Sequence, residues 1–303
     1  MDQASVISQM APAQLSSVAT WKDYFILTKP TISLLVVVTV VPAILMAAPI
    51  ALPSMILFTA VLIGTWLASS SAAIFNHLVD SDIDQQMVRT SRRPVASGRI
   101  SNTKAAGFAI VLGALSFGIL WKFATLNSAL IAVAANFFYV VVYTAYLKRR
   151  TVQNIVIGGA AGAVGPLIGW AAIDGTVGWP AWVLFAVIFM WTPPHFWALA
   201  LKYKDDYAKA KVPMMPCVKG DASTKLQMFL YTLTLIPLVV SLYWFGHAGL
   251  IYLVPSLLLT LYFSYLAGRL YFSGTNQLAM PLFHYSCLYL FGIFGSLMID
   301  CLL

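Results

Sequence analysis

The stretch SMILFTAVLIGTWLASSSAAIFNHLVDSDIDQQMVRTSRRPVASGR, residues 54–99, joins a long apolar run to the most charged segment of the chain. Its first 22 residues contain no charged side chain, and an apolar run of about 18 residues or more can cross a bilayer as a helix. The residues after it carry three aspartates and four arginines, although only 9% of the chain is charged. The stretch therefore predicts a membrane-spanning helix that ends in a charged loop.

The composition extends this prediction to the whole chain. Of the 303 residues, 60% are hydrophobic, with a mean hydropathy of +0.85, whereas a soluble domain is about a quarter charged. No β-barrel alternation appears, so helices must satisfy the backbone in lipid. We predict an all-α integral membrane protein, with residues 1–20 as a flexible cytoplasmic tail and residues 21–303 as one transmembrane domain. Its nine spanning helices are expected at residues 31–49, 54–75, 105–125, 127–147, 154–173, 179–199, 226–246, 248–267 and 281–301.

The distribution of positive charge predicts the orientation of these helices. With nine spans, seventeen of the eighteen Lys and Arg residues fall on the side of the N-terminus; Lys122 is the exception. Basic residues in short loops stay in the cytoplasm. We therefore expect the N-terminus inside and the C-terminus outside a bacterial inner membrane, and we read the net charge of +8 as orientation rather than nucleic-acid binding. The three widely spaced cysteines predict neither a disulfide framework nor a zinc site.

The ten acidic residues are all aspartates, and two groups of them follow equivalent spans. Asp80, Asp82 and Asp84 follow the second span, and Asp205 and Asp206 follow the sixth. Because four spans separate the two groups, both are expected at the same membrane face. A four-helix unit used twice, followed by a final helix, would place the acidic loops opposite each other.

Asn76, Asp80 and Asp84 are spaced to form one polar stripe. Each step of four residues turns a helix by only about 40° beyond a full turn, whereas Asp82 points to the opposite side. His77 lies beside the stripe, about 100° from Asn76 around the helix, and we expect it to be a bystander. Such oxygen ligands suit Mg²⁺ that shares its coordination with phosphates. The arginines that follow could pair with phosphate oxygens through planar guanidinium groups, although a solvated salt-bridge cluster is the alternative.

The motif Asn76-x-x-x-Asp80-x-x-x-Asp84, followed by Met87, Arg89, Thr90, Arg92, Arg93 and Pro94, resembles the UbiA superfamily of intramembrane prenyltransferases. The stretches YTAYLKRRTVQNIVIGGAAGAVGPLIGWAA (143–172) and WTPPHFWALALKYKDDYAKAKVPMMP (191–216) resemble its protoheme IX farnesyltransferase, or heme O synthase, branch. The resemblance covers nearly the whole chain from Thr28. One departure is that adjacent Asp205 and Asp206 stand where many members carry Asp-x-x-x-Asp, which leaves open whether one or two Mg²⁺ ions bind.

This resemblance implies a UbiA-like bundle that transfers farnesyl from farnesyl diphosphate to a vinyl group of heme b, giving heme O for heme–copper oxidase assembly. The implied partners are membrane lipid and a heme A synthase or terminal oxidase assembly protein. The expected metal ligands are Asn76, Asp80, Asp84, Asp205 and Asp206, with Asp206 preferred over Asp205. The expected catalytic residues are Asn76, Asp80, Asp84, Arg89 and His195, and the expected diphosphate-binding residues are Arg89, Arg92, Arg93, Lys148, Lys202 and Lys204.

His195, in the WTPPHF stretch, allows two interpretations. It could hold or orient the heme, since histidine is a common ligand of heme iron, or it could bond to backbone groups that Pro193 and Pro194 leave free. Two other functions also remain open at this point. One is an intramembrane prenyltransferase with a quinone precursor or another aromatic acceptor. The other is a transporter, although the charges lie at one membrane face rather than at mid-depth.

Overall fold

The computed structural model describes residues 19–48 and 52–303, and in this part of the chain nine helical segments are long and apolar enough to cross a membrane. This confirms the predicted number of spans. The segments are α3 (Pro30–Ala47), α4 (Met55–Val79), α6 (Asn102–Phe123), α7 (Leu126–Phe137) continued by η1 (Phe138–Tyr146) and η2 (Leu147–Arg149), α8 (Asn154–Gly162) with α9 (Gly165–Asp174), α10 (Trp179–Lys202), α13 (Gly220–Trp244), α14 (Leu250–Phe272) and α15 (Ala279–Leu302). Four short helices complete the described chain: α2 (Trp21–Leu27), α5 (Ser81–Gln86), α11 (Lys204–Lys209) and α12 (Met215–Val218).

The predicted bounds differ from the observed ones in places. Most of the predicted N-terminal tail, residues 1–18, and the end of the first predicted span, at residue 49, lie outside the described residues. The seventh span begins at Gly220 rather than at residue 226. Its first turns contain Asp221, which pairs with Lys204, and the buried Lys225, whose ammonium donates to the carbonyl of Thr275. Satisfied polar side chains thus let this helix start before its apolar run begins.

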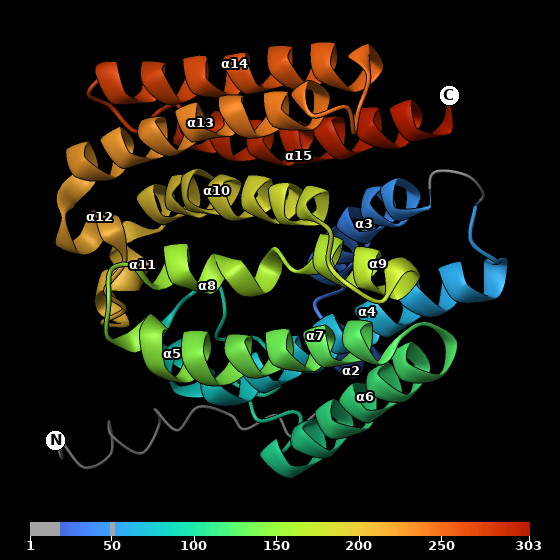
Figure 1. Cartoon of the computed structure of the whole chain (residues 1–303). Coiled ribbons are helices and arrows are strands. Elements are labelled where there is room, and N and C mark those ends of the chain that lie inside the picture. Colours follow the sequence, from blue (N-terminus) through green and yellow to red (C-terminus); the bar gives the residue numbers. More distant parts are fainter. Residues whose placement is uncertain (1–18, 49–51) are drawn as a thin grey trace, which may run out of the picture.

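The helices pack in two groups that meet at the middle of the molecule (Figure 1). In the first group, α4 packs against α3 and α6, while α9 contacts α3 and α7. In the second group, α10, α13, α14 and α15 pack in succession, and α15 also contacts both α10 and α3. The short helices α5, α11 and α12 lie together at the left end of the bundle in Figure 1. The division into two repeated four-helix units stays a prediction, but the two charged loops do lie at one end.

Small residues of the fifth span allow its neighbours to approach closely, as its Gly and Ala pattern predicted. A Cβ added at Gly158 would overlap the Tyr143 ring, and one added at Gly169 would come within 2.6 Å of the Val40 carbonyl oxygen. The span breaks between α8 and α9, where Pro166 lies in the first turn of α9. The break is expected because proline cannot donate a backbone hydrogen bond.

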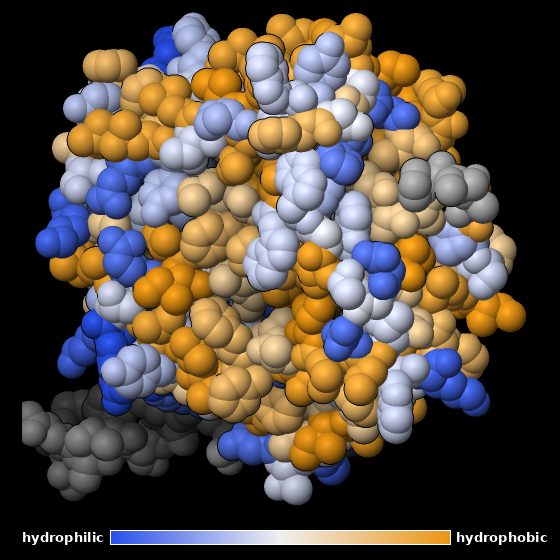
Figure 2. Space-filling view, in the orientation of Figure 1, coloured by the Kyte–Doolittle hydropathy of each residue, from blue (hydrophilic) through white to orange (hydrophobic). Residues whose placement is uncertain are grey.

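The outer surface of the bundle is largely hydrophobic. In Figure 2 many of the most hydrophilic residues lie along the left edge, close to α11 and α12 of Figure 1, while hydrophobic residues cover much of the remaining face. Large apolar side chains such as Ile110, Leu258 and Leu288 are exposed on different helices. Exposed aliphatic groups of this size fit lipid rather than water as the surrounding medium. The structure therefore agrees with the composition in identifying an integral membrane protein.

Candidate diphosphate and metal site

The polar stripe of the second span survives the end of its helix. The α-helix α4 ends at Val79 and α5 begins at Ser81, yet the Asp80 amide still donates to the Asn76 carbonyl (2.9 Å), and the Asp84 amide to the Asp80 carbonyl (2.8 Å). Because the four-residue ladder continues, Asn76, Asp80 and Asp84 all remain buried. The side chain of Asp82 is 58% exposed and pairs with Arg149, as its opposite direction predicted.

The Asp80 carboxylate is the centre of the first part of the site. It is fully buried, and its Oδ2 accepts from the Asn76 amide (2.7 Å) and from the Lys148 ammonium (2.5 Å). Lys29, in turn, donates to the Asn76 Oδ1 (2.5 Å). Lys29 directly precedes α3 in a left-handed conformation, with φ 46°. Residues from three different spans or their ends therefore converge on one polar cluster.

Asp84 forms the second part of the site with the loop that follows it. The Arg93 guanidinium donates from Nη1 to both carboxylate oxygens of Asp84, at 2.9 and 2.8 Å, and the Thr90 hydroxyl donates to the Asp84 carbonyl. Apolar residues anchor this charged loop, since Met87 and Ile100 are almost fully buried within it. These two buried side chains fix the loop, and with it Arg93, although most residues of the loop are polar.

A wide helical turn supplies the third side of the site. The fourth span changes from α-helix to π-helix over Phe138–Tyr146, and π-helical turns occur frequently at functional sites. Within it, the Thr144 hydroxyl donates to the Tyr139 carbonyl and accepts from the Asn76 amide (3.2 Å). The π-helix ends just before Lys148, which reaches Asp80.

The cluster carries an excess of positive charge. When Lys29 is protonated, it adds a third cation to Arg93 and Lys148, against the two buried carboxylates of Asp80 and Asp84. Burial, and then the positive charges of Arg93 and Lys148, lower the pKa of Lys29 to about 7, against the smaller opposite effects of Asp80 and Asp84. Such a site favours an anionic ligand, because an anion removes the repulsion among these cations.

The second acidic loop lies beside the first, and Arg89 joins them. The Arg89 guanidinium lies 5.7 Å from the centre of the Tyr203 ring, in the range of a cation–π contact. Burial raises the pKa of the Tyr207 hydroxyl, while the positive charges of the neighbouring Arg89 and then of Arg93 act in the opposite direction. Tyr203 and Tyr207 flank Asp205 and Asp206 in the sequence, so the two loops meet as their positions predicted.

Other predicted residues of this region are less closely joined to the cluster. Asp205 is exposed and Asp206 half-buried, and neither side chain makes an ion pair or hydrogen bond with the part of the chain that the structure describes. Lys204 pairs with Asp221 (2.7 Å), and Lys202 and Arg92 are exposed. A metal ion shared between the two loops therefore stays a prediction.

The buried oxygens of the first loop fit a divalent cation. Asp80 Oδ1 has no hydrogen-bond partner among the described residues although it is buried, and Asn76 and Asp84 add an amide oxygen and a second carboxylate. Across residues 19–48 and 52–303, no three His, Cys, Asp or Glu side chains stand close enough to hold a metal as they are oriented here. Since Asp80 and Asp84 face Lys148 and Arg93, these cations would have to turn from the carboxylates toward another anion when a metal binds.

Sequence reasoning missed three residues of this site. Lys29 and Thr144 come from other spans, and no local pattern connects them with Asn76. For His77 the sequence did contain the information. His77 stands seven residues before Asp84, and residues seven apart on a helix point in directions that differ by only about 20°. The structure places His77 Nδ1 at 4.0 Å from Asp84 Oδ2. His77 therefore shares the face of Asp84, and the expectation that it is a bystander stays a prediction.

His195 lies inside the bundle, at the contact between α10 and α15. Its ring stacks between Trp191 and Phe283, with ring centres 4.3 and 4.6 Å away. Its Nδ1 lies 2.6 Å from the hydroxyl of Ser286, and α10 runs unbroken through Pro193 and Pro194. In the described structure the ring thus bonds to a side chain of α15, not to the backbone near the prolines.

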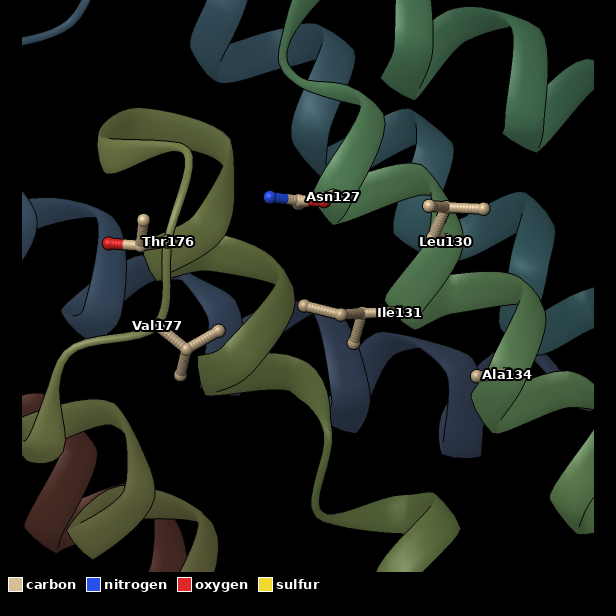
Figure 3. A pocket seen from close by; sticks show the side chains of 6 residues that line it. All are labelled: Asn127, Leu130, Ile131, Ala134, Thr176 and Val177. Carbon is tan, nitrogen blue, oxygen red and sulfur yellow. The ribbon is translucent and has the colours of Figure 1, made fainter.

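A shallow pocket of about 430 Å³ lies away from this cluster (Figure 3). Asn127, Leu130 and Ile131 line it from α7, and Thr176 and Val177 from the connection after α9. Asn127 and Thr176 belong to the ends of their spans opposite to Lys148 and Asn154. The pocket contains no ionisable side chain, so it does not form part of the charged site.

Comparison with known proteins places these features in a family. A sequence profile of the UbiA prenyltransferase family matches residues 36–291. The chain is 49% identical over 283 residues to a protoheme IX farnesyltransferase of Gloeobacter violaceus, covering 93% of this chain and 92% of the relative. It is 46% identical over 295 residues to a protein of the same name from Erythrobacter litoralis, covering 96% and 95%.

Solved structures share the fold. A structure described under the biosynthesis of digeranylgeranylglyceryl phosphate synthase in membranes matches with a TM-score of 0.77 at 16% identity, covering 92% of this chain and 98% of that one. A UbiA homolog from Archaeoglobus fulgidus bound to GPP and Mg²⁺ matches with a TM-score of 0.65 at 17% identity, covering 91% and 99%. With the profile match and the two close relatives, these findings show that the chain belongs to the UbiA prenyltransferase family.

Proposed function

We propose that this chain catalyses the Mg²⁺-dependent transfer of a farnesyl group from farnesyl diphosphate to a vinyl group of heme b, giving heme O. The observation that carries the proposal is the buried cluster of Asp80, Asp84, Lys148 and Arg93 at one end of an apolar bundle. Such a cluster offers oxygen ligands to a metal and cations to a diphosphate. The choice of farnesyl and heme rests on relatives that are 46–49% identical over nearly the whole chain.

The reaction separates charge before it forms the new bond. The bond between C1 of the farnesyl group and oxygen breaks, and the diphosphate keeps the electron pair. The allylic cation then bonds to the terminal carbon of the vinyl group. Water adds to the cation left on the inner vinyl carbon and releases a proton, which yields a hydroxyethylfarnesyl side chain. The main barrier is therefore the charge that develops on the departing diphosphate.

The site residues are suited to lower that barrier. Mg²⁺ would be held by Asn76, Asp80 and Asp84, with Asp206 from the second loop, and would neutralise charge on the leaving group. Lys148 and Arg93 would pair with phosphate oxygens, and preorganised cations of this kind supply one of the largest catalytic effects. The bundle beyond the cluster would keep water from the farnesyl cation until the acceptor has reacted.

Orientation and location follow from the same charges. We propose that the cluster opens to the cytoplasmic face of a bacterial inner membrane, because the basic loops favour that side. A membrane-embedded site is accessible to two amphiphilic substrates that partition into lipid. The heme O product would then be available to an enzyme that oxidises it further, or to an oxidase assembly protein in the same bilayer.

A product assay tests the proposal directly. Purified protein incubated with heme b, farnesyl diphosphate and Mg²⁺ is expected to yield a species heavier than heme b by one farnesyl group and one hydroxyl group, measured by mass spectrometry. Omission of Mg²⁺ with excess chelator should abolish the product, because without the metal the negative charge on the departing diphosphate is not neutralised. If the protein farnesylates a quinone precursor but never heme b, the proposed acceptor is wrong.

We propose that His195 holds or orients the heme. The Ser286 hydroxyl has one hydrogen, which it donates to the Phe283 carbonyl (2.6 Å). The His195 Nδ1 must then donate its own hydrogen to Ser286, which leaves Nε2 of the neutral ring with a free lone pair. This is the tautomer required of an iron ligand whose other nitrogen is fixed by a hydrogen bond.

A titration with heme b checks this role. The variant His195→Ala is expected to lose the shift of the heme absorption band that the unchanged protein produces, because no imidazole then reaches the iron. The matched control is His284→Ala, since His284 is exposed and lies on α15 between Phe283 and Ser286. If the heme band shifts in the His195 variant as it does in the unchanged protein, iron ligation by this residue is excluded.

A further inference from the structure

We propose that His77 supplies a nitrogen ligand to the divalent cation of the diphosphate site. The inference rests on the proposed function, since it assigns a further residue to the same metal. It adds imidazole to a ligand set that otherwise consists of oxygen atoms.

His77 is buried without a partner. Its side chain is 2% exposed, and neither Nδ1 nor Nε2 has a hydrogen-bond partner among the described residues. A neutral imidazole carries one N–H donor and one lone pair, and leaving both unused in a buried place is costly. A buried ring of this kind is retained more readily when it has a ligand to bind.

The direction of the ring points to the metal site. His77 Nδ1 lies 4.0 Å from Asp84 Oδ2, which is too far for a hydrogen bond but close enough for both atoms to contact one bound atom between them. Asp80 follows His77 by three residues, directly after the end of α4, and its Oδ1 is also buried and has no hydrogen-bond partner among the described residues. The unused polar atoms of this region therefore belong to neighbouring side chains of one helical face.

The spacing explains why these side chains share a face. From His77, the steps to Asp80 and Asp84 are three and seven residues, which leave the three directions within about 60° of one another. The backbone ladder across Asp80 keeps this geometry, because its hydrogen bonds of 2.9 and 2.8 Å continue the four-residue pattern. His77, Asp80 and Asp84 thus lie on one face on consecutive turns, and their side chains would have to turn toward one another to bind a metal together, since they do not converge as they are oriented here.

A nitrogen ligand changes which metals the site prefers. Carboxylate and amide oxygens suit Mg²⁺, whereas imidazole raises affinity for transition metals relative to Mg²⁺. We therefore expect the site to bind Mn²⁺ more tightly than Mg²⁺ and to contact it through a histidine nitrogen. Mn²⁺ is also a useful probe, because its unpaired electrons report bound nitrogen by pulsed electron paramagnetic resonance.

The test uses the full-length protein with Mn²⁺ and inorganic diphosphate. Modulation from a directly bound nitrogen is expected, and it should change frequency when the protein is labelled with ¹⁵N-histidine. The variant His77→Asn should lose this modulation, and its affinity for Mn²⁺ should fall by about tenfold or more while its affinity for Mg²⁺ falls less. Each of the other three histidines, His195, His247 and His284, is replaced singly as a control that should retain the modulation.

The outcomes separate this inference from the proposed function. Tightly bound Mn²⁺ without histidine coupling in the unchanged protein would overturn the role of His77 and leave the oxygen site intact. Loss of coupling in one of the three control variants, instead of in His77→Asn, would also overturn it. If the unchanged protein binds no Mn²⁺ even with diphosphate, the metal site itself is wrong. Should His77→Asn fail to fold, the labelled unchanged protein and the three controls still decide the assignment.

Discussion

The variant Asp80→Asn is expected to lower kcat/KM for farnesyl transfer by about 10³-fold, the scale reported when one preorganised electrostatic group is removed from an active site. Asparagine keeps the size of the side chain and an oxygen that can still accept from Asn76 and Lys148. It removes the negative charge that would attract the metal. The effect should therefore fall on catalysis and metal affinity, measured by product formation across a Mg²⁺ titration, rather than on folding.

The matched control is Asp82→Asn, in the same loop. It removes the same charge from the same short segment, but the Asp82 side chain is 58% exposed and pairs with Arg149 on the outside. An exposed pair contributes about 0–1 kcal/mol, so activity should change by less than about fivefold. Equal losses in the two variants would mean that net charge of the loop matters, and that Asp80 has no special role as a ligand. Thermal unfolding in detergent shows whether either variant has lost its fold.

The sequence predicted the membrane architecture because hydropathy reports directly on the solvent around each segment. It also predicted that Asp80 and Asp84 point one way and Asp82 the other. That prediction required only that the four-residue ladder continue past the end of α4, which it does. The seventh span was placed too late because hydropathy alone does not reveal that Asp221 and Lys225 find partners.

The pairing within the site could not be predicted in the same way. Lys29 and Thr144 reach Asn76 from 47 and 68 residues away, and only tertiary packing decides such contacts. The π-helical turn of Phe138–Tyr146 has no signature in the apolar sequence FYVVVYTAY. For His77 the information was present, because its seven-residue spacing to Asp84 predicts a shared face. Measuring the angle of His77 only from Asn76 hid this relation.

The variant Arg93→Lys is expected to lower kcat/KM by about 10²-fold, at the lower end of the effect of losing one electrostatic contact in an active site. In the structure Arg93 contacts both oxygens of Asp84, and we propose that it turns to the diphosphate when a metal takes its place. Lysine retains the positive charge but presents a single ammonium in place of the planar group that matches two oxygens. The loss should therefore appear although the charge of the site is unchanged, measured as KM for farnesyl diphosphate and kcat.

Arg92→Lys is the matched control for this prediction. Arg92 is the neighbouring residue in the same loop, but its side chain is exposed and makes no hydrogen bond with the described part of the chain; its carbonyl accepts from Arg99. If the arrangement around Asp84 selects the guanidinium that grips the diphosphate, Arg92→Lys should change kcat/KM by less than about threefold. A larger loss in Arg92→Lys than in Arg93→Lys would assign the phosphate contact to the exposed residue. Arg93 would then serve to hold Asp84 in place, and the exchange of partners that we propose for metal binding would be wrong.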